Sequence, residues 1–186
     1  MYKIVCLCGE AGTGKDTILQ ELTNKGYYGI VSCTTRPPRE GEVDGKNYFF
    51  YSQQKFLDYI NRGLMFENVV FNGWHYGTSC DSLKENLINI GVFNPEGIRI
   101  LSQNEDCELL IFRIIASDKT RLLRQLHREE CPNVEEIIRR YSADKKDFSN
   151  LNFDYIPICN ESIYDLSSGV EEILAQIEYW INQGQK

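Results

Sequence analysis

The stretch GEAGTGKDT, residues 9–17, decides the fold of this chain. It follows an apolar, strand-forming run at residues 2–8, and residues 15–24 continue with apolar side chains at helical spacing. A strand, a glycine-rich loop and a helix in this order predict a phosphate-binding loop. Glycines let consecutive N–H groups turn toward an anion beside a helix N-terminus. In such a loop Lys15 reaches the β- and γ-phosphates of a nucleotide.

Asp16 departs from the strict phosphate-loop pattern, in which Ser or Thr follows the lysine. One interpretation makes Asp16 a helix-start residue, because a negative charge is favourable in the first helical turn. The other places it in the outer shell of Mg²⁺ through a water molecule, with Thr17 supplying a hydroxyl. The predicted ATP-binding residues of the loop are Gly9, Glu10, Ala11, Gly12, Thr13, Gly14, Lys15, Asp16 and Thr17.

The rest of the chain alternates predicted strands and helices. Strands are expected at residues 29–32, 87–93, 108–116 and 153–159, and helices at 79–86, 94–102, from 117 onward and at 170–181. Residues 33–80 interrupt this rhythm with polar turns, short aromatic strands and a helix at 52–62, which indicates an inserted α+β subdomain. The predicted fold class is therefore α/β, a doubly wound, largely parallel sheet with one insertion. Residues 128–147 are highly charged with few apolar anchors, which is typical of a mobile segment.

Composition narrows the possible functions. The 186 residues carry a net charge of −7, which argues against a nucleic-acid partner, and no apolar run approaches the ~20 residues that span a bilayer. We expect a cytoplasmic protein, a monomer or a homodimer, without a membrane or nucleic-acid partner. The arginines gather at residues 36–39 and 113–140, as a cleft for an anion requires. Seven scattered cysteines show no metal-ligand spacing, so we interpret them as small buried hydrophobic residues in a reducing compartment.

Three stretches beyond the loop resemble motifs of the guanylate kinase family. They are VSCTTRPPREGEVDGKNYFF (residues 31–50), FENVVFNGWHYGTS (66–79) and NFDYIPICNES (152–162). Together with the loop they cover nearly the whole chain in compatible order and spacing. The resemblance implies one P-loop domain, residues 1–186, with a core at 1–32, 81–123 and 148–186, a GMP-binding subdomain at 33–80 and a helical lid at 124–147. It also implies an enzyme that phosphorylates GMP or dGMP with ATP and Mg²⁺.

The resemblance assigns four residues to the phosphate of the acceptor nucleotide. Arg36 and Arg39 match family arginines that hold this phosphate, and Tyr48 and Tyr76 match tyrosines that assist them. The two arginines lie three residues apart on a proline-containing turn. Two planar guanidinium groups at this spacing suit a phosphate dianion, which supports the assignment.

Glu67 matches the acid that reads the acceptor base in the family. One carboxylate can accept both the N1–H and the 2-amino group of guanine, whereas adenine presents a lone pair at N1. Ser32 matches a donor to guanine O6, and Thr78 matches a hydroxyl near the base. Asn94 stands where the family usually has an acid at a strand end, and we hypothesise that Asp16 partly replaces that acid near the metal.

The remaining assignments concern the donor and the lid. Arg124, Arg128 and Arg139 match family arginines that close over the transferring phosphoryl group, so with Lys15 and Arg36 they form the predicted catalytic set. Asn160 matches an asparagine near the donor base and is added to the ATP-binding residues. We interpret Arg121 and Arg140 as ordinary helix-surface arginines that pair with nearby glutamates.

Two other functions are compatible with a phosphate loop in this fold. A related P-loop kinase could use another acceptor, such as ribose 1,5-bisphosphate or another deoxynucleoside monophosphate, but Glu67 and the Arg36–Tyr76 set argue against it. A non-catalytic guanylate-kinase-like binding module would be expected to degrade the phosphate loop, which here keeps Gly9, Gly14 and Lys15. The departures at Asp16 and Asn94 fit a divergent bacterial or phage member of the family.

Overall fold

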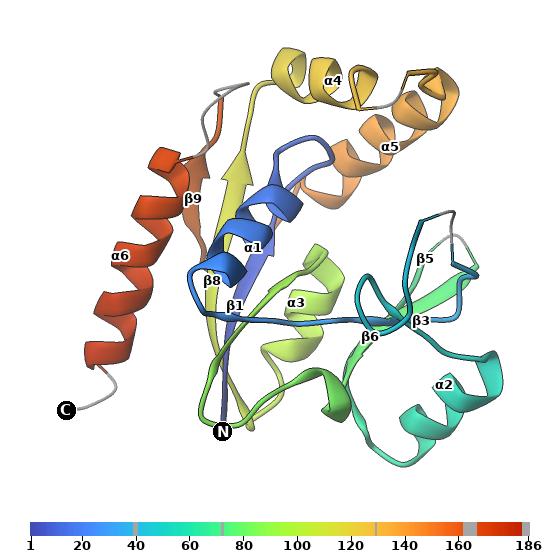
Figure 1. Cartoon of the computed structure of the whole chain (residues 1–186), viewed down its shortest axis with the longest axis vertical. Helices are drawn as coiled ribbons and strands as arrows, with labels where there is room; N and C mark the ends of the chain where they lie inside the picture. The colour runs from blue at the N-terminus through green and yellow to red at the C-terminus, as the bar shows by residue number, and fades with distance from the viewer. Residues whose placement is uncertain (39–40, 72, 129, 162–166, 184–186) are drawn as a thin grey trace.

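The structure, a computed structural model, describes residues 1–38, 41–71, 73–128, 130–161 and 167–183. Arg39 of the predicted acceptor site therefore lies outside the described residues. Two sheets stand side by side in the molecule, a larger one surrounded by helices and a smaller one toward α2 (Figure 1). The phosphate loop and the helices α4 and α5 lie at the same end of the larger sheet.

The larger sheet is parallel throughout its described strands. These are β1 (Tyr2–Cys8), β2 (Tyr28–Gly29), β7 (Ile88–Val92), β8 (Cys107–Ile115) and β9 (Ile156–Cys159), in the order β2-β7-β1-β8-β9. The chain builds outward from β1 first on one side and later on the other. This confirms the predicted doubly wound sheet, and it puts the loop that follows β1 at the switch point where such folds bind ligands.

Helices cover both faces of this sheet because side chains of a strand alternate between its faces. Helices α1 (Lys15–Asn24) and α6 (Ser167–Gln183) cover one face and α3 (Pro95–Leu101) covers the other, while α4 (Asp118–Leu126) and α5 (Val134–Asp147) lie at the end of the sheet. Val5 and Leu7 of β1 pack with α1 and α6 on one face, whereas Ile4 and Cys6 pack with α3 on the other. The core therefore holds β1 rigidly on both sides, and β1 positions the phosphate loop.

The smaller sheet joins β3 (Cys33–Thr34), β4 (Phe49–Phe50), β5 (Met65–Phe71) and β6 (Trp74–Ser79), in the order β4-β3-β6-β5. The hairpin of β5 and β6 is antiparallel, with Glu67 opposite Thr78. Helix α2 (Gln53–Asn61) begins where predicted, because the Ser52 hydroxyl accepts a hydrogen bond from the Lys55 N–H at 3.2 Å. Phe56 of α2 is fully buried and fixes the helix against this sheet.

Two expectations from the sequence are wrong. Residues 79–86 do not form a helix: only a short 3₁₀ turn, Cys80–Ser82, follows β6. The Asn89 side chain explains the difference, because it bonds both the N–H and the carbonyl oxygen of Lys84 and so holds a loop there. The cysteines are also not uniformly buried, since Cys131 and Cys159 are exposed.

Candidate active site

Side-chain hydrogen bonds hold the carbonyl groups of the phosphate loop, residues 9–14, in place. Four successive carbonyls each accept a side-chain hydrogen bond: Glu10 O from Lys15 Nζ (3.0 Å), Ala11 O from Arg121 Nε (3.0 Å), Gly12 O from Arg124 Nη1 (3.1 Å) and Thr13 O from Asn160 Nδ2 (2.7 Å). Holding the carbonyls on the outside directs the N–H groups of the loop toward its inner side. Inward N–H groups are what an anion-binding loop needs.

Glycine is required in this loop for conformation and for space. Gly12 has φ +82°, and a Cβ placed there would lie 2.5 Å from the Arg121 carbonyl oxygen. Gly14 has φ +94° and immediately precedes α1. The backbone of α4 can therefore pack directly against the loop, and the first turn of α1 begins at its other end.

Arg121 is the main residue that the sequence interpretation misses. It is not a surface arginine: only 2% of it is exposed, and its guanidinium also donates to Asp118 Oδ1 and Asp144 Oδ2, each at 3.1 Å. A charge pattern cannot reveal this, because Arg121 and Asp144 are far apart in the chain and come together only when α5 packs on α4. Arg140 behaves as interpreted, pairing with Glu136 on its own helix.

Arg124 and Asn160 also contact the loop from behind. Arg124 Nη2 donates to the Asn160 carbonyl oxygen at 3.1 Å while its Nη1 holds Gly12. Asn160 is 5% exposed and is tied to the end of β8 through its N–H and the Ile115 carbonyl oxygen. In the structure Arg124 therefore fixes the loop, which differs from the predicted position over the phosphoryl group.

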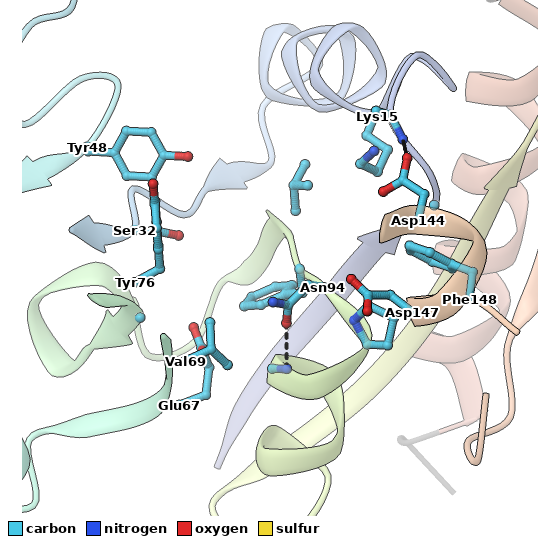
Figure 2. Close-up of a pocket in the computed structure, with 17 residues that line it drawn as sticks. Lys15, Ser32, Tyr48, Glu67, Val69, Tyr76, Asn94, Asp144, Asp147 and Phe148 are labelled. Atoms are coloured by element: carbon cyan, nitrogen blue, oxygen red, sulfur yellow. Dashed lines mark hydrogen bonds between the residues drawn. The ribbon is translucent and has the colours of Figure 1, made fainter. Parts of the chain in front are cut away.

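A cavity of about 310 Å³ runs from the phosphate loop to the smaller sheet (Figure 2). Predicted site residues that line it are Gly9, Ala11, Lys15, Ser32, Tyr48, Glu67, Tyr76 and Asn94. Residues not singled out by the sequence also line it: Val69, Gly77, Val92, Phe93, Pro95, Gly97, Asp144, Asp147 and Phe148. The cavity thus brings the phosphate loop together with five of the predicted acceptor residues, with the C-terminal end of α5 at its side; Arg36 and Thr78 do not line it.

Glu67 is a buried carboxylate at the far end of this cavity from Lys15 (Figure 2). Its Oε1 accepts a hydrogen bond of 2.9 Å from the Thr78 hydroxyl across the β5–β6 hairpin. Burial raises the pKa of Glu67 to about 7, and the Thr78 hydrogen bond opposes this rise only partly. A carboxylate kept largely from water, with Thr78 as its hydrogen-bond partner, has capacity left for donors of a ligand.

Helix α3 closes the cavity behind Glu67. Asn94 is its N-cap, with Oδ1 accepting from the Gly97 N–H at 2.7 Å, so its amide oxygen serves the helix. Gly97 allows the helix to approach, because a Cβ there would lie 3.3 Å from Glu67 Oε2. No such packing role is evident in the sequence, since it depends on α3 lying against β5.

Arg36 lies beside the predicted acceptor tyrosines. Its guanidinium group is 5.5 Å from the centre of the Tyr48 ring, and Tyr48 meets Tyr76 edge to face. Both of its terminal nitrogens bond Glu42 at 2.9 Å, and this pairing raises the pKa of Arg36. The guanidinium is thus held in a planar, bidentate geometry that suits an oxyanion.

The other predicted lid arginines and metal residues lie at the surface. Arg128 is exposed just beyond the end of α4, and Arg139 of α5 bonds Glu136 through two nitrogens. These contacts help to lower the pKa of Glu136 to about 2. Asp16 and Thr17 are exposed in the first turn of α1, next to Lys15.

Comparison with known proteins shows the family of this chain. The family model described as guanylate kinase matches residues 1–177. A guanylate kinase of Prochlorococcus marinus (strain MIT 9312) is 33% identical over 160 residues, covering 82% of this chain and 86% of that protein. A guanylate kinase of Helicobacter pylori (strain 26695) is 34% identical over 182 residues, covering 94% and 85%.

A solved structure supports the same fold. The crystal structure of guanylate kinase from Anaplasma phagocytophilum covers 99% of this chain and 87% of its own, with a TM-score of 0.62 and 18% identity. A phosphate loop at the switch point of a parallel sheet, facing a second small sheet across one cavity, defines the class of P-loop kinases. Within that class, this chain belongs to the guanylate kinase family.

Proposed function

We propose that this cavity binds GMP with its base at Glu67 and its phosphate toward the loop, where ATP delivers the γ-phosphoryl group. The protein is a guanylate kinase, and ATP-dependent phosphorylation of GMP is its activity. The observation that carries the placement is Glu67, a buried carboxylate in the same cavity as Lys15. None of the described residues forms a helix long and apolar enough to cross a membrane.

Glu67 selects guanine by the pattern of its donors. An ionised carboxylate accepts from both N1–H and the 2-amino group, and Thr78 holds it in place through Oε1. Adenine would leave the buried carboxylate facing a lone pair. Mispairing of this kind discriminates strongly between ligands, because buried polar groups without partners are costly. Ser32, which lines the cavity, supplies a hydroxyl for guanine O6.

The acceptor phosphate is bound beside Tyr48 and Tyr76, which line the cavity. Arg36 lies against the Tyr48 ring, and Glu42 holds its guanidinium in place. The phosphate oxygen of GMP attacks the γ-phosphoryl group in line, so no covalent enzyme intermediate is needed. Residues 33–80 then act as the acceptor-binding subdomain of the proposed single domain.

The donor site is the inner side of the phosphate loop with Lys15. Lys15 is half-buried, and this burial lowers its pKa, while nearby carboxylates, led by Asp16, oppose that shift. Arg128 and Arg139 belong to the proposed lid, residues 124–147, and contribute charge to the transferring group when the lid closes. Asn160 is placed behind the loop at the donor side.

Mg²⁺ is the proposed metal cofactor. The described residues contain no cluster of three or more His, Cys, Asp or Glu side chains suited to a metal. One exposed carboxylate beside a hydroxyl group fits Mg²⁺, which is usually held by one or two carboxylates, waters and substrate phosphates rather than by an all-protein cage. Asp16 and Thr17, in the first turn of α1, are the residues that would hold it. When bound with ATP, the ion neutralises phosphate charge during transfer.

A phosphoryl-transfer assay with a panel of acceptors tests the proposal. We expect ATP·Mg²⁺ to phosphorylate GMP and dGMP, with kcat/KM for AMP lower by about 10⁴-fold because of the mispaired carboxylate. Glu67→Gln should lower kcat/KM for GMP strongly and leave ADP binding unchanged. Equal use of GMP and AMP by the wild-type protein would overturn the placement of the base.

A further inference from the structure

Asp144, a residue of α5, contacts the phosphate loop directly. Its Oδ2 accepts a hydrogen bond from the Ala11 N–H at 2.7 Å and another from Arg121 Nη2 at 3.1 Å. Figure 2 shows its carboxylate beside Lys15, in the wall of the cavity. The two contacts come from a backbone N–H of an anion-binding loop and from a buried guanidinium, which are the donors that bind phosphate oxygens in proteins.

The surroundings of Asp144 are those of a bound anion rather than of a surface carboxylate. Its side chain is 19% exposed, and burial raises its pKa. Arg121 donates to the Ala11 carbonyl oxygen through Nε and to Asp144 through Nη2. Together the two side chains bond both the carbonyl oxygen and the N–H of Ala11. One carboxylate oxygen thus lies where the loop and Arg121 donate together.

We propose that Asp144 is a built-in competitor of the donor nucleotide: its carboxylate occupies the place of an oxygen of the terminal phosphate, and Arg121 binds that phosphate once Asp144 leaves. This inference rests on the proposed use of ATP by the loop. The Ala11 N–H can serve Asp144 or a phosphate, but not both at full strength. Arg121 thereby becomes a donor-binding residue in addition to those placed above.

The exchange is favourable only when an anion replaces Asp144. Arg121 is 2% exposed, and a buried guanidinium that loses a charged partner is strongly destabilised. A phosphate carries more charge than a carboxylate and offers several oxygens for the same donors. The exchange does not require α5 to detach, because Tyr141 and Lys145 hold α5 to Asp118 of α4 at 2.6 and 2.9 Å.

Binding of two nucleotides to the full-length protein tests the competition. The probes are the β,γ-imido analogue of ATP and ADP, titrated calorimetrically in EDTA so that metal binding plays no part. Asp144→Ala should tighten binding of the triphosphate analogue by about tenfold, the worth of one charge-assisted hydrogen bond. The gain should be clearly smaller for ADP, which lacks the terminal phosphate.

Asp16→Asn is the matched control for charge alone. It removes a negative charge whose effect on Lys15 is larger than that of Asp144, whereas the Ala11 N–H donates to Asp144. If Asp144→Ala gives no more tightening than Asp16→Asn, or weakens the analogue, the competition is overturned. A larger gain for Asp144→Ala supports it.

A second variant tests Arg121 as a phosphate-binding residue. Arg121→Lys, made in the Asp144→Ala background, keeps the charge but loses the fork of donors. It should weaken binding of the triphosphate analogue by about tenfold more than binding of ADP. Equal losses for both ligands would indicate a merely structural role and overturn this part, while the Asp144→Ala result stands independently.

The two proposals fail in different ways. If the wild-type protein binds neither ADP nor the triphosphate analogue, the donor site is misplaced and the proposed function falls together with this inference. If it binds both and phosphorylates GMP while Asp144→Ala shows no selective gain, only the competition by Asp144 is wrong.

Discussion

At the scale of single residues, burial separates the charged side chains to which we assign functional roles. Glu67 and Arg121 are 5% and 2% exposed, and each is kept in place by hydrogen bonds to named partners. Asp16 and Arg128 are exposed, so their charges count only when a ligand or a closed lid excludes water. Substitutions of the buried charges should therefore change the stability of the free protein, whereas substitutions of the exposed charges should change only ligand binding or catalysis.

Glu67 should make the stability of the protein depend on pH. Its pKa is raised by burial from 4.5 to about 7 in the folded state, so the folded protein binds this proton more tightly than the unfolded chain. The resulting stability is fully present below pH 4.5 and is lost as the pH rises through about 7. The loss amounts to about 3 kcal/mol at 1.36 kcal/mol per pKa unit.

Urea unfolding of the wild-type protein and of Glu67→Gln at pH 5 and pH 8 measures this effect. The wild-type protein should lose about 2–3 kcal/mol relative to the variant between these pH values, while other titrating groups cancel in the difference. A pH-independent difference between the two proteins would mean that Glu67 ionises normally.

Asp16 and Asn94 pose a second question at this scale. If Asp16 partly replaces the acid missing at Asn94, then Asp16→Ser should lower kcat less in an Asn94→Asp background than alone. Asn94→Asp should keep the N-cap of α3, since either side chain can accept from the Gly97 N–H. Strictly additive changes in kcat would leave Asp16 as a helix-start residue.

At the scale of elements, the contact between α4 and the phosphate loop positions the proposed donor site. Gly12 permits this contact, because the Arg121 carbonyl oxygen lies 2.5 Å from where a Cβ would be. Arg121 and Arg124 then reach around the loop to its carbonyl groups. We call this contact between α4 and the phosphate loop the clamp. Its loss should lower both the free energy of unfolding and the activity.

Gly12→Ala should separate the clamp from simple backbone strain. We expect a loss of unfolding free energy of about 3 kcal/mol and loss of activity, because the methyl group meets backbone that cannot yield. Gly63→Ala is the control: Gly63 has φ +67° but nothing within 4 Å of its Cβ position. It should cost about 1 kcal/mol through strain alone. Similar losses for both variants in urea unfolding would argue against the clamp.

At the scale of the whole molecule, one cavity joins parts that are far apart in the chain. The loop after β1, the hairpin of β5 and β6, and the end of α5 all contribute to its lining. Proposed closure of residues 124–147 would bring exposed arginines over this cavity. Their contribution should appear in the transition state rather than in substrate binding.

Arg128→Ala tests this closure by steady-state kinetics. It should lower kcat by about 10²-fold or more with little change in KM for either nucleotide, as expected for charge stabilised only during transfer. Lys119→Ala, which removes an exposed positive charge from α4, should leave both constants unchanged. A change confined to KM would move Arg128 from catalysis to ground-state binding.

Much of this architecture was predictable from local patterns. The phosphate loop, the helices that begin next to residues 52, 94 and 117, and the parallel sheet follow from residue spacing. The helix expected at residues 79–86 was wrong because the Asn89 side chain, five residues beyond Lys84, satisfies the backbone there instead. Such a bond is invisible to periodicity.

The sequence by itself determined the phosphate loop, the largely parallel sheet and the family, because these depend on short motifs and on hydrophobic period. Only the tertiary structure decided which charges meet. It buried Arg121, set Asp144 against the Ala11 N–H and turned Arg124 behind the loop. The physical reason is that the energy of a charge depends on its partners and on its distance from water, and both are fixed only when α4 and α5 pack on the loop.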